Sequence, residues 1–128
     1  MQIRDAVEAD AGRLTELTDA PQDVMRNLIH DRTVRVAEDD EVIVGFVSFD
    51  ARAKTVHVTQ IEGSADACVQ LLDEPMSFAE GEGMAVELLV PESSETVREA
   101  VLDVGFDEEG TGPTFDGTPT VRYRLEFE

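Results

Sequence analysis

The fold is decided by residues 56–106, which read VHVTQIEGSADACVQLLDEPMSFAEGEGMAVELLVPESSETVREAVLDVGF. Residues 56–61 alternate largely between apolar and polar side chains, a pattern typical of a half-buried strand. A Gly63-Ser64 turn separates this strand from a helix with one apolar face. Residues 84–90 are almost continuously apolar, which indicates a strand buried on both faces. A second, shorter apolar-faced helix then completes a strand–helix–strand–helix unit.

The remaining elements lie on either side of this stretch. The apolar spacing predicts a strand over residues 1–4, helices starting at Ala11 and Pro21, strands over 33–38 and 42–49, and strands at Phe106 and over 120–127. Residues 110–120 are expected to form a loop, because Gly, Pro and Thr dominate there. The predicted order is therefore β-α-α-β-β-β-α-β-α-β-β.

Four residues are predicted to set helix boundaries. Asp10 and Ser64 are expected to cap the helices that follow them. Pro21 suits the first position of its helix, where no amide is needed. Pro75 lies inside an apolar helical repeat, so a kink or a break is expected there.

The element order resembles that of the GNAT acetyltransferase superfamily. The resemblance rests on Ile3-Arg4-Asp5-Ala6 with Asp10, on Val36-Ala37-Glu38 with Val44-Gly45-Phe46, and on Gly105-Phe106. It covers nearly the whole chain, and it implies one α/β domain over residues 1–128. The expected fold is a GNAT-like mixed, mostly antiparallel central sheet with helices on both faces.

The resemblance implies acetyl-CoA as co-substrate, bound where the fourth and fifth strands splay apart. Pantetheine would contact the backbone of Thr59, Gln60 and Ile61. The diphosphate would lie on the next helix N-terminus, a common anion site. The residues implied there are Gly63, Ser64, Ala65, Asp66, Ala67 and Cys68, with Ser94 at the start of the helix after the fifth strand.

The chain departs from the family pattern at the phosphate loop. The usual Arg/Gln-x-x-Gly-x-Gly/Ala positions are Gly63, Asp66 and Cys68 here. A carboxylate about 4 Å from a phosphate costs on the order of 1 kcal/mol in water. Asp66 is therefore either an obstacle that CoA binding must tolerate or a helix-dipole partner in an empty site.

The catalytic groups implied by the resemblance are also altered. A tyrosine that protonates the departing thiolate in many family members is Val101 here, which has no proton to give. A general base must take a proton from the attacking amine. Three residues of the fourth and fifth strands are candidates for that base: Glu62, His57 and Glu87.

The amino-acid composition narrows the classes of partner that the protein is expected to bind. Acidic residues outnumber basic ones 29 to 10, giving a formal charge of −19, while 41% of residues are hydrophobic. This charge argues against a nucleic-acid or anionic-membrane surface. We interpret the excess carboxylates as a halophilic adaptation to a salty cytoplasm; an acidic face for a cationic partner is the alternative.

Cys68 is the sole cysteine, so no intramolecular disulfide can form. Its apolar neighbours indicate a small core residue rather than a nucleophile. No basic-then-apolar leader, membrane-spanning run or metal-ligand spacing is seen, and a cytoplasmic protein is expected. The sequence leaves open whether the protein forms a homodimer.

Two functions are compatible with these observations. The first is an acetyl-CoA-dependent N-acetyltransferase acting on an amine of unknown identity, either a small molecule or a protein. The second is a GNAT-fold module that has lost catalysis and serves in binding or regulation. Asp66 and Val101 favour the second function.

Overall fold

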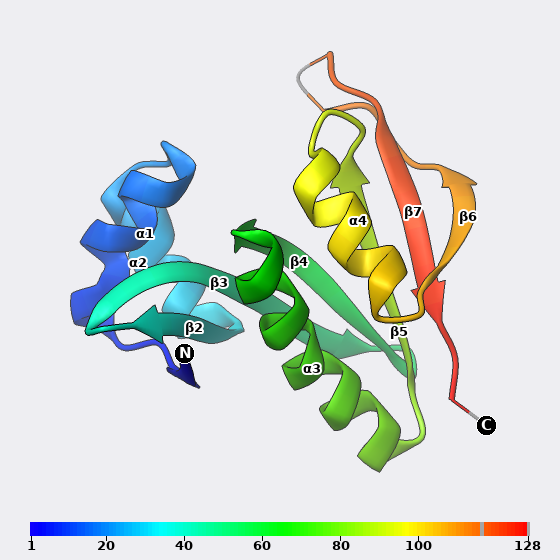
Figure 1. Cartoon of the computed structure of the whole chain (residues 1–128), viewed down its shortest axis with the longest axis horizontal. Helices are drawn as coiled ribbons and strands as arrows, with labels where there is room; N and C mark the ends of the chain where they lie inside the picture. Colours follow the sequence, from blue (N-terminus) through cyan, green and yellow to red (C-terminus); the bar gives the residue numbers. More distant parts are fainter. Residues whose placement is uncertain (116, 128) are drawn as a thin grey trace.

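The computed structural model describes residues 1–115 and 117–127, and Figure 1 shows its elements. In chain order they are β1 (Gln2–Asp5), the 3-10 turn η1 (Glu8–Asp10), α1 (Ala11–Thr18), α2 (Gln22–Asp31), β2 (Thr33–Asp39), β3 (Val42–Arg52), β4 (Thr55–Gly63), α3 (Ala65–Glu82), β5 (Ala85–Pro91), α4 (Glu95–Asp103), β6 (Asp107–Thr111) and β7 (Thr120–Leu125). The predicted order of strands and helices is confirmed.

The strands form one seven-stranded sheet in the order β1-β2-β3-β4-β5-β7-β6. Among the described residues, β4 and β5 are the only parallel neighbours, and every other pair is antiparallel. The prediction of a mixed, mostly antiparallel sheet is therefore confirmed. The parallel pair is joined through α3, which crosses the sheet between β4 and β5.

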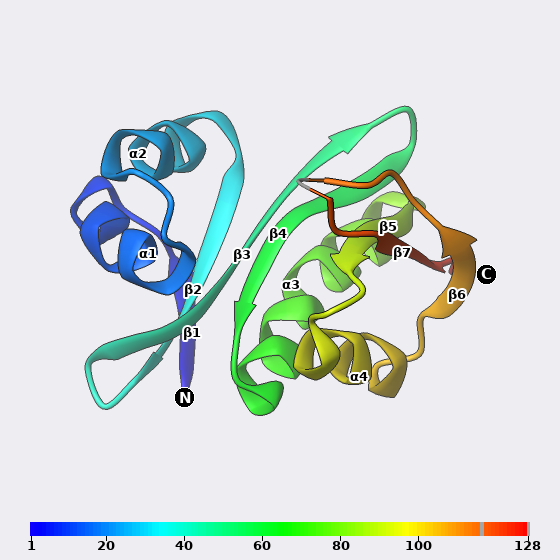
Figure 2. The same cartoon turned by 90° about the horizontal axis from the view of Figure 1, so that it is seen from above.

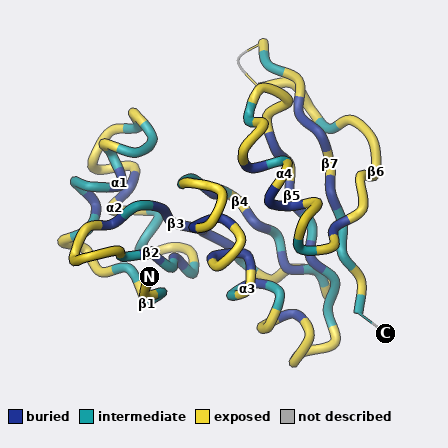
Figure 3. The backbone as a smooth tube through the Cα atoms, in the orientation of Figure 1, coloured by how far each residue is buried: buried dark blue, intermediate teal, exposed yellow. Residues whose placement is uncertain are grey.

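Helices cover both faces of the sheet, as predicted (Figure 2). The helices α3 and α4 lie side by side and enclose the larger group of buried side chains, which includes Leu71, Val86 and Val101. The helices α1 and α2 enclose a smaller group around Leu14 and Phe46. Figure 3 shows that β6 is exposed along its length, whereas buried residues recur along β3, β4 and β5.

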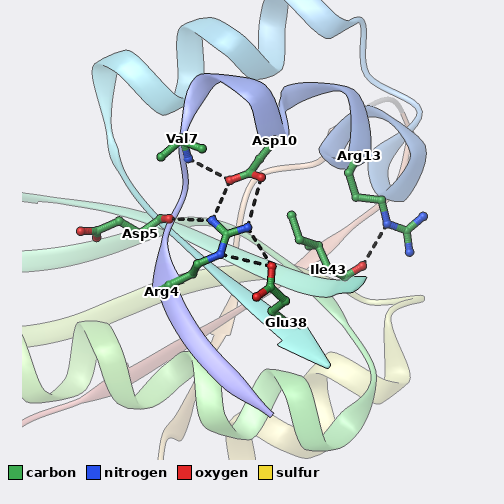
Figure 4. Close-up of polar contacts among 7 residues, drawn as sticks. All are labelled: Arg4, Asp5, Val7, Asp10, Arg13, Glu38 and Ile43. Carbon is green, nitrogen blue, oxygen red and sulfur yellow. Dashed lines mark hydrogen bonds and ion pairs between the residues drawn. The ribbon is translucent and has the colours of Figure 1, made fainter. Parts of the chain in front are cut away.

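An ion-pair network holds β1 against β2 and η1 (Figure 4). The Arg4 guanidinium donates to the Asp10 carboxylate at 2.9 Å and to Glu38 at 3.0 Å. The Asp10 carboxylate also accepts the Val7 amide at 2.9 Å, so it does not cap α1 as predicted. Burial alone would raise the pKa of Asp10, but the Arg4 and Val7 hydrogen bonds hold that pKa below its usual range.

The predicted break at Pro75 is wrong. The helix α3 runs from Ala65 to Glu82 as one α-helix with Pro75 inside it. The Leu71 carbonyl loses its usual amide partner there, because proline has no N–H. Pro75 is buried on the same apolar face as Leu72 and Ala79, so packing of this face outweighs the lost hydrogen bond.

Several element boundaries differ from the prediction by one or a few residues. Ser64 caps α3 as predicted, since its Oγ accepts the Ala67 amide at 3.3 Å. Pro21 is the residue before α2 rather than its first residue. The strand β6 continues to Thr111, so the loop that follows it is shorter than predicted. None of the described helices is long and apolar enough to cross a membrane.

The acidic surface leads to a prediction about salt. With 29 carboxylates and 10 cations, like-charge repulsion acts against the folded state in dilute buffer. Molar KCl reduces the screening length to about 3 Å, so the melting temperature should rise from low to molar KCl, by about 4 °C for each kcal/mol of repulsion that is screened. Thermal unfolding followed by circular dichroism checks this. A flat or falling melting temperature would instead support the acidic-interface interpretation of the composition.

Candidate active site

The strands β4 and β5 part halfway along their length. Their parallel register runs from Thr55 opposite Ala85 to Val58 opposite Leu88, and it ends there. Beyond Val58, β4 is paired to β3 on one side and has no strand partner on the other among the described residues. The second half of β4 therefore offers a free backbone edge, as the sequence resemblance implied.

A β-bulge marks the point where the strands part. In the β3–β4 register, Ser48 lies opposite Gln60 and Phe49 opposite Val58, so Thr59 is the extra residue. The hydroxyls of Thr59 and Ser48 are hydrogen-bonded at 2.7 Å, which fixes the bulge. A bulge bends a strand and increases its local twist, and this bulge lies where the β4–β5 pairing ends.

A cavity of about 530 Å³ lies at this opening. It is bounded by β4, β5, β7, the start of α4 and the loop before β7. Its walls include seven of the residues predicted from the sequence: His57, Thr59, Gln60, Ile61, Glu62, Glu87 and Ser94. Its volume falls in the range of small-molecule sites.

Glu62 is the predicted base with the strongest structural support. Its carboxylate lines the cavity, is half-buried and has no hydrogen-bond or ion-pair partner among the described residues. Burial raises its pKa above the usual glutamate value. A desolvated carboxylate with a raised pKa is a better proton acceptor than one in water.

His57 and Glu87 lie opposite each other in the β4–β5 register and also line the cavity. The Glu87 carboxylate is held by a short hydrogen bond from Arg124 on β7. This ion pair occupies one of the two oxygens of the Glu87 carboxylate, Oε2. Asp50 lies opposite His57 on β3. His57 therefore stands between two carboxylate-bearing positions.

The N-terminus of α3 adjoins the open edge of β4. Ser64, Ala65 and Asp66 are exposed, and their amides have no hydrogen-bond partner among the described residues. The Ala67 and Cys68 amides differ, because they already donate to the Ser64 hydroxyl and carbonyl. Of the amides predicted to hold phosphate, those of residues 64–66 are therefore available.

Cys68 is fully buried, as predicted. Burial raises the pKa of its thiol to about 11, and Glu62 adds to this effect. A thiol in that state is not a nucleophile at neutral pH.

Gly63 has a packing role that the sequence did not reveal. The start of α3 crosses the β3–β4 pair so closely that a Cβ on Gly63 would lie 3.1 Å from the Gly45 Cα and 3.2 Å from the Ala67 Cβ. A Cβ on Gly45 would lie 2.6 Å from the Glu62 carbonyl oxygen. Gly63 also has a φ of 143°, which a residue with a Cβ rarely adopts. The two glycines thus set how closely the start of α3 approaches β3 and β4.

Few of the described side chains are placed to protonate a leaving thiolate. Val101 is fully buried in the core. Tyr123 is also fully buried, and its hydroxyl accepts a hydrogen bond from Arg98 at 3.1 Å. Ser94 lines the cavity and its side chain does not cap α4. Its hydroxyl is therefore free to act as a hydrogen-bond donor toward the cavity.

The cavity residues that were not singled out from the sequence include Arg52, Arg122 and Phe115. Arg122 alternates with the buried Val121 and Tyr123, so a solvent-facing position was predictable. The sequence contains no signal that this face borders the opening of β4 and β5. Among residues 1–115 and 117–127, no group of three or more His, Cys, Asp or Glu side chains is placed to hold a metal ion.

In sequence, no family model matches this chain, and no curated protein matches it either. Solved structures are similar over nearly its whole length. A protein from Salmonella typhimurium, described as an acetyltransferase and solved with its cofactor acetyl-CoA, has a TM-score of 0.81 and 16% identity, covering 99% of this chain and 94% of that one.

Two further solved structures are similar. A protein from Desulfovibrio desulfuricans, described as a GNAT-family acetyltransferase, has a TM-score of 0.75 and 20% identity, with 98% of each chain covered. The protein TTHA1254 from Thermus thermophilus has a TM-score of 0.74 and 27% identity, covering 90% of this chain and 93% of that one. The present chain has the GNAT fold.

Proposed function

We propose that this GNAT-fold chain is an acetyl-CoA-dependent N-acetyltransferase that acts on an amine. The observation that carries the proposal is the opening between β4 and β5, which combines a free strand edge, a cavity of about 530 Å³ and an exposed helix N-terminus. The acetyl-CoA-bound protein from Salmonella typhimurium, similar over 99% of this chain, supports the same ligand.

The residues present fit acetyl-CoA at both ends of the opening. The free amides of Ser64, Ala65 and Asp66 would hold the diphosphate, since a helix N-terminus attracts anions through its amides and its dipole. The backbone of Thr59, Gln60 and Ile61 would bind the pantetheine arm as an added strand. Acetyl-CoA, when bound, supplies an acetyl group activated as a thioester.

The chain's own residues supply the other functions. Glu62 would take the proton from the attacking amine, because its carboxylate is unpaired among the described residues, half-buried and faces the cavity. The fully buried Val101 and Cys68 take no part in proton transfer. Proton return to the leaving thiolate then falls to the Ser94 hydroxyl or to water.

The second candidate function is a GNAT-fold binding or regulatory module without catalysis. It is favoured by Asp66, which places a carboxylate in the first turn of α3, and by Val101, which replaces a proton donor. Against it, Asp66 is exposed, and Glu62 has a pKa raised by burial. An unpaired, partly desolvated carboxylate that lines a cavity is typical of a functional site and is suited to proton transfer.

Asp66→Gly tests whether the site at the start of α3 binds CoA or is vestigial. If CoA binds, removal of this charge should tighten binding by up to about fivefold, or about 1 kcal/mol, and the gain should shrink as salt screens the repulsion. If the site is vestigial, neither form will bind. Calorimetric titration of both proteins with acetyl-CoA measures the difference. Weaker binding by Asp66→Gly than by the parent would contradict both interpretations of Asp66, because this residue would then order the ligand.

The enzymatic activity is tested by measuring acetyl transfer to an amine. The protein in molar KCl is incubated with acetyl-CoA and a panel of small amines, and release of the free thiol is followed. Thiol release that depends on both the amine and Glu62 is expected. Saturable acetyl-CoA binding with no transfer to any amine or amine-bearing peptide would favour the binding module.

A further inference from the structure

Two large apolar side chains of the cavity wall are exposed. Phe115, on the loop before β7, is 57% exposed, the largest exposed fraction among the large apolar side chains that the structure describes. Leu89 on β5 is 36% exposed. Both line the cavity between β4 and β5. A single exposed apolar side chain needs no explanation, but two that line one cavity offer a surface on which an apolar ligand is removed from water.

The loop that carries Phe115 is held against Leu89. A Cβ on Gly112 would lie 2.6 Å from the Leu89 Cδ2, so the loop backbone runs directly against the Leu89 side chain. The Gly112 amide donates to the Thr120 carbonyl at 3.0 Å, and the Thr120 hydroxyl donates to the Pro113 carbonyl at 2.6 Å. The Phe115 backbone makes two further hydrogen bonds across the loop, at 2.8 and 2.9 Å. Leu89 and Phe115 therefore form one apolar strip, fixed by backbone contacts.

The inner end of the apolar strip is within reach of the proposed base. Val58 and Leu88 form the last β4–β5 pair, so Leu89 lies one residue past that pair and Glu62 four residues past it. At ~3.3 Å per residue, about 10 Å of strand separates the levels of Leu89 and Glu62. The bulge at Thr59 shortens this gap, and the two side chains shorten it further. An amine that carries a short carbon chain spans the remainder.

Phe115 lies at the outer end of the apolar strip. The loop leaves the sheet at Gly112 and Thr120, whose backbones are hydrogen-bonded. Thr120 lies opposite Pro91, two residues past Leu89 on β5. A chain that starts near Glu62 would therefore contact Leu89 first and Phe115 only when it is longer.

The charges around the cavity favour neither an anionic nor a second cationic group on the acceptor. Besides His57, two cations and two anions line the wall: Arg52, Arg122, Glu62 and Glu87. Nearby charged side chains on the adjoining strands are paired, Asp50 with Arg32, and Arg124 with Glu87 and Glu126. Two further carboxylates, Asp107 and Glu109, lie on β6 beside β7. The wall itself is thus balanced in charge, in a chain of net charge −19.

Arg122 is the charged residue nearest to the apolar strip. It lies opposite Leu89 in the β5–β7 register and is exposed. An exposed arginine keeps its guanidinium in water while its carbon stem covers apolar surface. Arg122 therefore extends the apolar surface beside Leu89 without bringing a buried charge to it.

We propose that the acceptor is an amine with an apolar chain, an alkylamine or an arylalkylamine, whose chain lies on Leu89 and Phe115 while its amino group faces Glu62. The proposal rests on the proposed function and specifies its substrate class. Contact with the apolar strip removes the chain from water, which favours binding by about fourfold for each CH2 that is buried.

Straight-chain amines from propylamine to hexylamine test the proposal, because their amino groups differ little in basicity. In the parent, kcat/KM should rise about fourfold with each added CH2 that reaches the apolar strip. The rise should come from a falling KM at nearly constant kcat, since the chain is buried equally before and during transfer. A kcat/KM that does not rise with chain length would overturn the proposal.

Matched variants assign the effect to the two residues. Leu89→Ala should reduce the gain along the whole series, whereas Phe115→Ala should reduce it only for the longer amines and cost hexylamine about tenfold. Leu89→Met, which keeps the apolar volume, should retain the gain. Phe78→Ala and Leu102→Ala are the controls, since these residues are 45% and 49% exposed and neither lines the cavity. Equal losses in the controls and in the variants of the apolar strip would overturn the proposal.

Charged chain ends provide a second comparison. Both 6-aminohexanoate and hexane-1,6-diamine carry a charge where hexylamine has a methyl group, and that charge would lose water against Phe115. Each should therefore have a lower kcat/KM than hexylamine. A preference for 6-aminohexanoate would overturn the proposal and make Arg122 the residue that selects the acceptor. A preference for the diamine would overturn it in favour of the carboxylates.

A binding measurement separates this proposal from the proposed function. N-Butylacetamide and N-hexylacetamide carry the chain but need no transfer, and each is titrated into the parent and into Phe115→Ala. The parent should bind the hexyl compound about 15-fold more tightly, and Phe115→Ala should lose most of this difference. That result supports the apolar strip even if no amine is acetylated. Acetyl transfer to amines with equal binding of the two probes would overturn the apolar strip and leave the acetyltransferase intact.

Discussion

Glu62→Gln should lower kcat/KM for acetyl transfer by about 100-fold or more, the usual contribution of a general base. The substitution keeps the size and removes the proton-accepting charge. Acetyl-CoA affinity should change little, because the proposed diphosphate contacts are backbone amides of residues 64–66. Initial rates and a calorimetric titration of the same variant check both expectations.

The pH profile adds a second test of Glu62. Burial raises the pKa of this carboxyl, and a base works only when it is deprotonated. Activity should therefore rise with pH through a midpoint above the usual glutamate value, and Glu62→Gln should lose this acidic limb. The same desolvation acts against the folded state when the carboxylate is charged. Glu62→Gln should thus be at least as stable as the parent at neutral pH.

Two neighbouring variants are the controls for Glu62. Glu87→Gln breaks the ion pair with Arg124, so it should reduce stability while keeping the acidic limb. His57→Gln should also keep that limb. If either variant lost the acidic limb of the pH–activity profile while Glu62→Gln stayed active, that residue would be the general base in place of Glu62.

Gly45→Ala should lower the free energy of unfolding by about 2 kcal/mol, within the usual range for overpacking. The added Cβ would lie 2.6 Å from the Glu62 carbonyl oxygen and 3.2 Å from the Gly63 Cα. Both neighbours are backbone atoms of the paired strand β4, so neither can rotate away. Urea unfolding in molar KCl measures the change. Acetyl-CoA affinity should fall as well, because the clash displaces β4 at the start of α3.

Gly81→Ala is the matched control. Gly81 lies inside α3, and an added Cβ there would meet no atom within 4 Å. Alanine should stabilise the helix by up to about 1 kcal/mol, since glycine disfavours a helix interior. Similar destabilisation by both substitutions would show that the close approach of β3, β4 and α3 is not the cause.

The sequence predicted the element order because each helix and strand has its own spacing of apolar residues. Residues 56–61 alternate, the helix after Ser64 has an apolar stripe, and residues 84–90 are continuously apolar. Pro75 shows where local patterns fail. Its local penalty predicts a kink or a break, but the apolar face that it shares with Leu72 and Ala79 keeps α3 in one piece.

The candidate site was predictable in part. Its β4 and α3 residues follow one another in the chain, so a resemblance in that stretch places them together. Arg52, Arg122 and Phe115 reach the cavity from β3, from β7 and from a loop. Their meeting depends on strand register across the whole sheet, which no local pattern contains. The crossing of Gly45 and Gly63 was missed for the same reason.

The opening between β4 and β5 is the proposed acetyl-CoA site, and a calorimetric titration of the parent protein in molar KCl measures that binding. We expect saturable binding of one acetyl-CoA per chain, with a matching rise in melting temperature. At 100 times the dissociation constant the ligand should add about 2.7 kcal/mol to the free energy of unfolding. A folded protein that shows neither heat of binding nor a change in melting temperature at millimolar acetyl-CoA would contradict this proposal.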